Sequence, residues 1–223
     1  MKKFKLTSEF IVDISGVKLF RIKALIEFGN VKAGDLGGYI EKEENLSHMG
    51  NAWVSGNAQV SGDARVSGDA RVSGNAQVSG DARVSGNAQV SGNAWVFGDA
   101  QVFGNARVSG NARVSGDARV SGNARVFGNA RVSGNARVSG DAQVFGDARV
   151  SGDKDYAYAH GFGSCNRTTT FFRLKDGDVG VRCGCFYGTL AQFRDNVCET
   201  HGETKKAQEY LMLADLMDFR FKN

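Results

Sequence analysis

The chain has 223 residues, of which 30 are glycine and none is proline, and its 28 basic and 24 acidic side chains give a formal net charge of +4. This length allows one domain or two. The glycines fall on a fixed period, unlike those of a disordered linker, and the net charge is far below that of a committed nucleic-acid-binding protein.

Residues 1–47 predict a strand-rich N-terminal cap. Apolar side chains alternate over residues 10–14 and 20–26, and Ser15-Gly16 between them favours a turn. A rod of stacked repeats requires such a cap, because its open end would otherwise pair with another chain. Neither a signal-peptide core nor a stretch of membrane-spanning length is present, so we expect a cytoplasmic protein with reduced thiols and no membrane contact.

Residues 48–153 form a hexapeptide repeat. Valine recurs at every sixth position from Val54 to Val150, and the hexad reads Val-Ser/Phe-Gly-Asn/Asp-Ala-Arg/Gln/Trp. Alanine two residues before each valine gives the period of a short strand with one apolar face, and the Gly-Asn or Gly-Asp step supplies a corner. The pattern resembles the repeat of left-handed parallel β-helices, in which three hexads form one triangular coil. It predicts a mainly β rod of five to six coils, roughly 27 Å long at ~4.8 Å per coil.

Assigning successive hexads to three faces places the outward side chains in columns. The first face carries Trp53, Arg71, Gln89, Arg107, Arg125 and Gln143. The second carries Gln59, Gln77, Trp95, Arg113, Arg131 and Arg149. The third carries Arg65, Arg83, Gln101, Arg119 and Arg137.

One corner column is acidic and precedes the third face's arginines by two residues. It consists of Asp63, Asp81, Asp99 and Asp117. We expect these aspartates and the arginines to neutralise one another, which would keep the rod soluble. A face that binds a polyanion and a face for protein contact are the alternatives, with Arg113, Arg131 and Arg149 as candidate residues.

Aromatic side chains that replace the usual serine are candidates for a binding surface. They are Phe97, Phe103, Phe127 and Phe145, all predicted to point outward. Phe127 and Phe145 are neighbours on the first face, and Trp95 shares a strand with Phe97. Exposed aromatic side chains in register indicate an interface for a partner or for self-association. The alternative is that they pack beneath a terminal module or are scattered on the surface.

Residues 154–223 predict a small C-terminal α+β module. Residues 172–185 predict a hairpin around an Asp-Gly turn. Thr189 and Gln192 form a capping-box pattern that starts a helix. Thr204 is placed to start a second helix.

The cysteines of this module permit two interpretations. Cys183, Cys185, Cys198 and His201 could supply four zinc ligands. The hairpin cysteines continue an alternating apolar face, however, and Cys198 continues the apolar side of the first helix. We therefore expect buried thiols and no metal.

A phosphate site is a further candidate. The segment from His160 to Thr170 combines glycines, Arg167 and three threonines, and backbone amides with an arginine can hold a phosphate. It lacks the Gly-Lys-Ser/Thr ending of a P-loop, so a linker that leads into a threonine-rich strand explains it equally well.

Catalytic equipment is absent from the repeats. Many hexapeptide-repeat proteins are acyltransferases that use a histidine and loops projecting from the coils. After His48 the repeats contain no His, Lys or Cys and no interrupting loop, so they offer neither a general base nor the wall of a substrate pocket. We expect no enzymatic activity and no cofactor; a relative of the acyltransferases without activity is an alternative.

Both ends of the chain resemble known proteins. The stretches Lys18-Leu-Phe-Arg-Ile22, residues 28–41 and residues 45–54 resemble the entry segment of hexapeptide-repeat proteins common in bacteriophage and prophage genomes, which are related to polymer-forming β-helix proteins. Residues 168–172 and 183–190 resemble the tail module of such phage proteins. The resemblance implies a β-helix of phage origin. We expect a scaffold that binds itself or a host protein, with countering host defence as one role for such binding, and keep nucleotide or nucleic-acid binding as the alternative.

Overall fold

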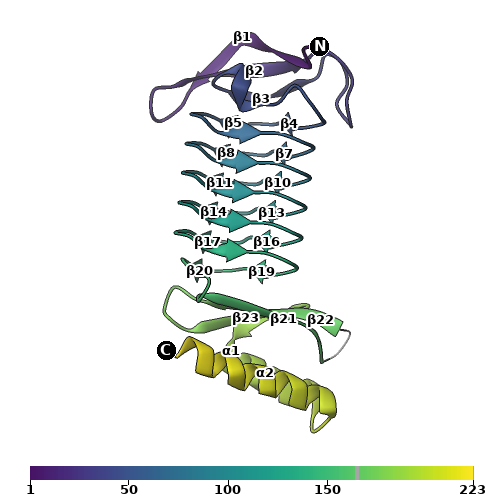
Figure 1. Ribbon diagram of the computed structural model, residues 1–223, viewed down its shortest axis with the longest axis vertical. Helices are drawn as coiled ribbons and strands as arrows, with labels where there is room; N and C mark the ends of the chain where they lie inside the picture. Colours follow the sequence, from purple (N-terminus) through teal and green to yellow (C-terminus); the bar gives the residue numbers. More distant parts are fainter. Residues whose placement is uncertain (164–165, 223) are drawn as a thin grey trace.

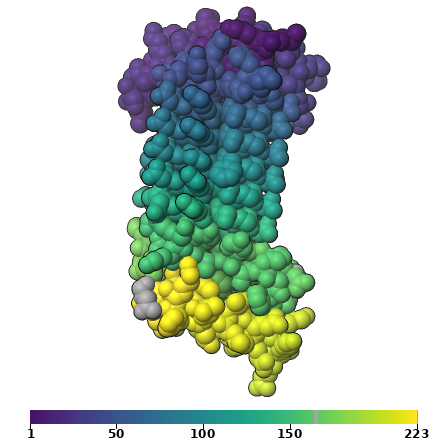
Figure 2. Space-filling model, in the orientation of Figure 1, coloured from purple at the N-terminus to yellow at the C-terminus, as the bar shows by residue number. Residues whose placement is uncertain are grey.

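The computed structural model describes residues 1–163 and 166–222, which form a parallel β-helical rod with a wider module at each end (Figures 1 and 2). The predicted β-helix with a β-rich cap and a small α+β module is confirmed.

The rod consists of two-residue strands in three parallel sheets, one for each face. The first sheet contains β4 (Trp53–Val54), β7 (Arg71–Val72), β10 (Gln89–Val90), β13 (Arg107–Val108), β16 (Arg125–Val126) and β19 (Gln143–Val144). The second contains β5 (Gln59–Val60), β8 (Gln77–Val78), β11 (Trp95–Val96), β14 (Arg113–Val114), β17 (Arg131–Val132) and β20 (Arg149–Val150). The third contains β6 (Arg65–Val66), β9 (Arg83–Val84), β12 (Gln101–Val102), β15 (Arg119–Val120) and β18 (Arg137–Val138).

The predicted columns are confirmed by the strand register. Gln89 pairs with Arg71 on one side and with Arg107 on the other, so equivalent side chains of successive coils stack. The valines and alanines of all hexads are buried and form one continuous core. Burial of this apolar column is the main driving force for stacking the coils.

Each corner depends on glycine. Gly86, as an example, has a φ of 65°, in the left-handed region, and a Cβ added there would lie 3.0 Å from the backbone nitrogen of Gly104 in the next coil. A side chain would therefore be strained by both the conformation and the close approach. The asparagines that follow the glycines reinforce the stack: Asn75 Nδ2 donates to Asn93 Oδ1 at 3.1 Å.

The N-terminal cap extends the second sheet. β1 (Phe4–Val12) and β2 (Lys18–Ala24) are antiparallel, and β3 (Leu36–Ile40) joins β2 to β5, to which it runs parallel. A short 3-10 helix, η1 (Glu43–Asn45), leads into the first coil.

Side chains of the cap complete the hydrogen bonding at the N-terminal end of the rod. Along the rod, the first residue of each strand donates its N–H to a carbonyl of the next coil towards the C-terminus, as Trp53 N does to Ala70 O, so the first coil presents carbonyls that no preceding coil covers. Lys3 Nζ donates to Ala52 O at 2.8 Å, and Asn45 Nδ2 donates to Ala64 O at 2.9 Å. These side-chain donors take the place of the backbone N–H groups that a preceding coil would supply.

Acceptors have the same role at the other end, where N–H groups have no coil beyond them. Arg137 N donates to Asp153 Oδ1 at 2.9 Å, and Gln143 N donates to Thr170 Oγ1 at 2.9 Å. Tyr156 Oη also donates to the carbonyl of Arg137 at this end, and Glu41 Oε2 accepts from Gly62 N at the other, so each terminal segment supplies both donors and acceptors to the open backbone groups of the rod.

The C-terminal module is a four-stranded antiparallel sheet covered by two helices. Its strands follow one another in the order β21 (Tyr156–Phe162), β22 (Arg167–Arg173), β23 (Val179–Cys183) and β24 (Phe186–Thr189). The helices are α1 (Leu190–His201) and α2 (Lys205–Phe221). The predicted Thr189 capping box and Thr204 cap are confirmed, whereas β21 and β24 were not predicted.

The sheet of this module lies between the rod and the helices. On β22, Phe172 belongs to the core of the rod, and the adjacent Phe171 belongs to the core beneath the helices. Successive side chains of a strand point to opposite faces, so this pair joins the module to the last coil.

Candidate functional site

The predicted aromatic candidates separate into three places. Phe127 and Phe145 are in contact, with ring centroids 4.5 Å apart, and Phe145 meets the ring of Tyr187 of β24 at 4.6 Å. Arg182 of β23 also lies over the Phe145 ring, 5.4 Å from its centroid. These two phenylalanines therefore pack beneath the C-terminal module, which was the alternative interpretation for them.

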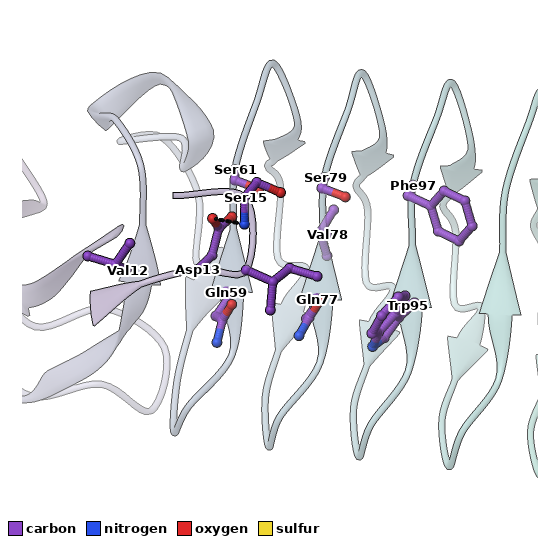
Figure 3. A pocket seen from close by; sticks show the side chains of 11 residues that line it. Val12, Asp13, Ser15, Gln59, Ser61, Gln77, Val78, Ser79, Trp95 and Phe97 are labelled. Carbon is purple, nitrogen blue, oxygen red and sulfur yellow. Dashed lines mark hydrogen bonds between the residues drawn. The ribbon is translucent and has the colours of Figure 1, made fainter. Parts of the chain in front are cut away.

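Trp95 and Phe97 lie in the N-terminal half of the rod, at the third rod strand of the second sheet counted from the cap, and share a cleft with the turn that connects β1 and β2. The turn and the second sheet enclose a cleft of about 370 Å³, here termed the turn cleft (Figure 3). Its lining includes the turn residues Val12, Asp13, Ile14 and Ser15 and the rod residues Gln59, Gln77, Trp95 and Phe97. In Figure 3, Gln59, Gln77 and Trp95 form one column across three successive coils, and Ser61, Ser79 and Phe97 form a second column on the same coils.

Hydrogen bonds hold the β1–β2 turn in shape. Asp13 Oδ1 accepts from Ser15 N at 2.8 Å and from Val17 N at 2.9 Å, an arrangement that short acidic side chains favour in turns. The side chain of Ile14 is nevertheless 97% exposed. A fixed turn thus presents an isoleucine to solvent beside a cleft that contains two aromatic side chains.

Arg113 of the following coil contacts Trp95. Its guanidinium carbon lies 4.9 Å from the centroid of the Trp95 ring in the preceding coil, which is a cation–π geometry. Phe97 remains 37% exposed.

Phe103 is separate from both groups. It follows β12 on the third sheet, at a different corner, and is 37% exposed like Phe97. Within the described part of the chain, no aromatic contact of Phe103 is formed.

The expected neutralisation of the arginine and aspartate columns is supported only at longer range, where the charge of Arg65 contributes to the lowered pKa of the Asp63 carboxyl. Among the residues that the structure describes, no rod arginine forms an ion pair with a rod aspartate. The aspartates lie at corners, where the chain turns, whereas the arginines project from the flat strands. Asp63 pairs with Lys42 of the cap instead, at 2.7 Å, and this hydrogen-bonded partner lowers the pKa of the Asp63 carboxyl.

Arg113, Arg131 and Arg149 stack in register along the second sheet. Arg149 donates to the carbonyl of Ala148 at 2.9 Å. Burial, and then the neighbouring charge of Arg131, lower the pKa of Arg149. Asp147 partly offsets this effect, but in the described residues the column is a row of positive charge without an ion pair.

The predicted burial of the thiols is wrong for two cysteines. β23 ends at Cys183, which is half-buried, and Gly184 turns the chain with a φ of 58°, so Cys185 is exposed. Cys198 is exposed as well, because the buried side of α1 ends at the preceding Val197.

The zinc candidates are not brought together. In residues 1–163 and 166–222, no three side chains of His, Cys, Asp or Glu are arranged to hold a metal ion. His201 stacks on Tyr210 instead, with ring centroids 5.9 Å apart.

The predicted phosphate segment forms one wall of a second cleft. His160 belongs to β21 and Arg167 to β22, while Ser164 and Cys165 between them lie outside the described residues. The cleft has a volume of about 300 Å³ and is here termed the junction cleft, because it lies where the first sheet meets the C-terminal module. It is lined by Asn123, Arg125, Asp141, Gln143, His160, Asn166, Arg167, Thr168 and Gly184.

Neither cleft could be located from the sequence, because each combines segments far apart in the chain.

Comparison with known protein families gives a match to part of the rod and to neither terminal segment. A family model described as YdcK Beta solenoid repeat matches residues 58–74, 64–80, 76–92, 88–102, 100–116, 118–132 and 130–143. No curated protein matches the chain. In the described residues, no helix has the length and apolar character needed to cross a membrane.

Proposed function

We propose that the protein is a non-enzymatic scaffold that acts through protein–protein contact, and that the turn cleft mediates association with a second copy of the chain. The observation that carries this proposal is the exposed Ile14 beside Trp95 and Phe97. A projecting apolar side chain next to a cleft that contains two aromatic side chains is self-complementary, since a two-fold axis would place the Ile14 of each copy in the cleft of the other.

The chemistry of the turn cleft supports binding rather than catalysis. Asp13 is the one ionisable residue in its lining, and one carboxylate oxygen of Asp13 accepts two backbone hydrogen bonds. The lining supplies no histidine, cysteine or lysine to act as a base or nucleophile. Glutamine and serine around the aromatic side chains resemble the polar rim of an interface.

The proposed origin and cellular location of the protein rest on its resemblance to known proteins. Both ends of the chain resemble segments of phage and prophage hexapeptide-repeat proteins, which supports a phage origin and a place in the host cytoplasm. A scaffold of this kind could counter host defence by binding a host protein, and that partner is the alternative occupant of the turn cleft.

Sedimentation velocity over a range of protein concentrations tests the proposal. The wild-type chain is expected to form dimers, and the double variant Ile14→Ser with Phe97→Ser to weaken the association at least about tenfold, because buried anchor side chains dominate interface energies. Serine is the usual residue at the Phe97 position, so the rod should keep its fold.

Phe103→Ser is the matched control. It removes an equally exposed phenylalanine from a different corner, and the association should be unchanged. A wild-type chain that stays monomeric at high concentration would overturn self-association, and equal effects of Phe97→Ser and Phe103→Ser would overturn the assignment to the turn cleft.

A further inference from the structure

We propose that the junction cleft binds the phosphate group of a phosphate monoester, such as a nucleotide 5′-phosphate, between Arg125 and Arg167. This inference is independent of association through the turn cleft, which lies at the opposite end of the rod. It rests on the geometry of the two arginines, on the neutral donors around them, and on the distribution of charge along the rod.

The two arginines reach the junction cleft from different parts of the fold. Arg125 projects from β16 on the first sheet, and Arg167 stands at the start of β22 in the module. Within residues 1–163 and 166–222, neither side chain forms an ion pair or a hydrogen bond. Two guanidinium groups in one cleft, neither in an ion pair among the described residues, favour an anion with several oxygens, which each guanidinium can hold through two parallel N–H donors.

Gly184 holds Arg167 in place. A Cβ added to Gly184 would lie 2.2 Å from Arg167 Nη1, so the guanidinium packs directly on the turn after β23. The φ of 58° at Gly184 also favours glycine. The turn therefore positions the arginine before any ligand arrives, which lowers the entropic cost of binding.

Neutral polar groups surround the two charges. The Thr168 hydroxyl and His160 Nδ1 lie 2.9 Å apart and share one hydrogen bond. Asn123 and Asn166 also line the junction cleft. Hydroxyl and amide donors of this kind commonly complete the coordination of a phosphate whose charge is held by arginine.

Asp141 is the one acidic residue of the lining, and it opposes anion binding. Its Oδ1 accepts from Asn123 Nδ2 at 2.9 Å. It is the last member of a corner column in which the preceding coils carry asparagine at residues 87, 105 and 123. The two arginines still outnumber it, and asparagine would fit the column at this position.

The rod itself is polarised towards the junction cleft. From residue 53 to residue 101, three of nine outward strand positions are arginine and the corners carry four aspartates. From residue 107 to residue 149, seven of eight outward strand positions are arginine, with three aspartates. The junction cleft lies in the basic half, where the field attracts anions.

Isothermal titration calorimetry at low salt tests the proposal with four probes: inorganic phosphate, a nucleoside 5′-monophosphate, and one oligonucleotide with either a 5′-phosphate or a 5′-hydroxyl. We expect inorganic phosphate to bind weakly and the monophosphate more tightly. Arg125→Gln and Arg167→Gln should each lower the affinity for the monophosphate at least about tenfold. Asp141→Asn should raise it about fivefold by removing a like charge.

Arg83→Gln is the matched control, because it removes the same charge from the third sheet and glutamine already occurs among the outward strand residues. Circular dichroism verifies that each variant is folded. A preference for the 5′-phosphorylated oligonucleotide over the free monophosphate would identify a nucleic-acid end as the source of the phosphate.

Three results would overturn the assignment. They are no binding of any phosphate monoester at millimolar concentration, equal losses for Arg83→Gln and Arg125→Gln, and equal binding of the 5′-hydroxyl and 5′-phosphate oligonucleotides. The last two would mean that the charge of the rod attracts anions without a specific site.

Discussion

At the scale of single residues, Lys3 combines a buried amine with a structural role. Its side chain is 1% exposed, its Nζ lies 4.7 Å from the centroid of the Phe28 ring, and it donates to the carbonyls of Gly50 and Ala52. Burial lowers its pKa to about 8, against a partial opposing effect of Asp69. The charged form therefore costs stability, although the amine is needed to cap the first coil.

The stability of the protein should depend on this amine in the alkaline range. Between pH 8 and 10.5, Lys3 is neutral in the folded state and still protonated in the unfolded state, so unfolding takes up a proton and rising pH favours the folded state. Below pH 8 both states are protonated and the contribution is constant. When the pH is raised from 7.5 to 9.5, the free energy of unfolding of the wild-type chain should increase by up to roughly 2 kcal/mol relative to that of Lys3→Met. Urea denaturation at the two pH values measures this difference. An unchanged difference between the two proteins would contradict this assignment.

The sequence predicts which side chains stack, but it does not predict what covers them. The assignment of successive hexads to three faces places Trp95, Phe97 and Phe145 correctly because the repeat has no insertion. The environment of Phe145 depends on Tyr187, and that of Phe97 on Ile14, and both partners belong to terminal segments without the repeat. No periodicity relates those segments to the rod.

At the scale of the elements, the arginines of the second sheet form a column without ion pairs among the described residues. Arg113, Arg131 and Arg149 occupy successive strands of one sheet, about 4.8 Å apart. Like charges at this spacing destabilise the folded state, and dissolved salt screens them.

Stability should accordingly rise with salt. Raising sodium chloride from 0.05 to 0.5 M should increase the free energy of unfolding by about 0.5–1 kcal/mol, and Arg131→Gln, which interrupts the column, should reduce this gain. Arg194→Gln is the control: Arg194 pairs with Asp215 at 2.5 Å, so its loss should not reduce the gain. Urea midpoints at both salt concentrations measure the effect, and a gain that Arg131→Gln leaves unchanged would contradict it.

The ends of the rod show a second limit of prediction at this scale. The alternation of residues 10–14 and 20–26 is sufficient to predict β1 and β2, and the cap sequence at Thr189 is sufficient to predict the start of α1. The capping roles of Asn45 and Asp153 are not predictable in this way. They depend on which backbone groups the ladder leaves unpaired at each end, and that follows only from the direction of the hydrogen bonds between coils.

At the scale of the whole molecule, the rod is a one-dimensional stack in which each coil contacts its neighbours. The cap is joined to the first coil through β3 and β5, and the module contacts the last strands, β19 and β20, through β22. Among the described residues, neither the cap nor the C-terminal module forms a hydrogen bond, ion pair or ring contact with residues 101–118, so the number of coils there should be free to change.

Deleting residues 101–118 removes one whole coil and tests this independence. Arg131 would then stack below Trp95 in place of Arg113, and every valine and alanine would keep its column. We expect a folded, cooperative variant whose urea m-value is lower in proportion to the lost surface, with both clefts retained and the rod shorter by about 4.8 Å.

Deleting residues 101–103 instead places the downstream valines out of phase with the valines of the preceding coils, and should destabilise the rod strongly. If the one-coil deletion unfolds the chain while the three-residue deletion is tolerated, the stack is not modular. Retained association and phosphate binding in the one-coil variant would show that the rod acts as a spacer between two independent ends.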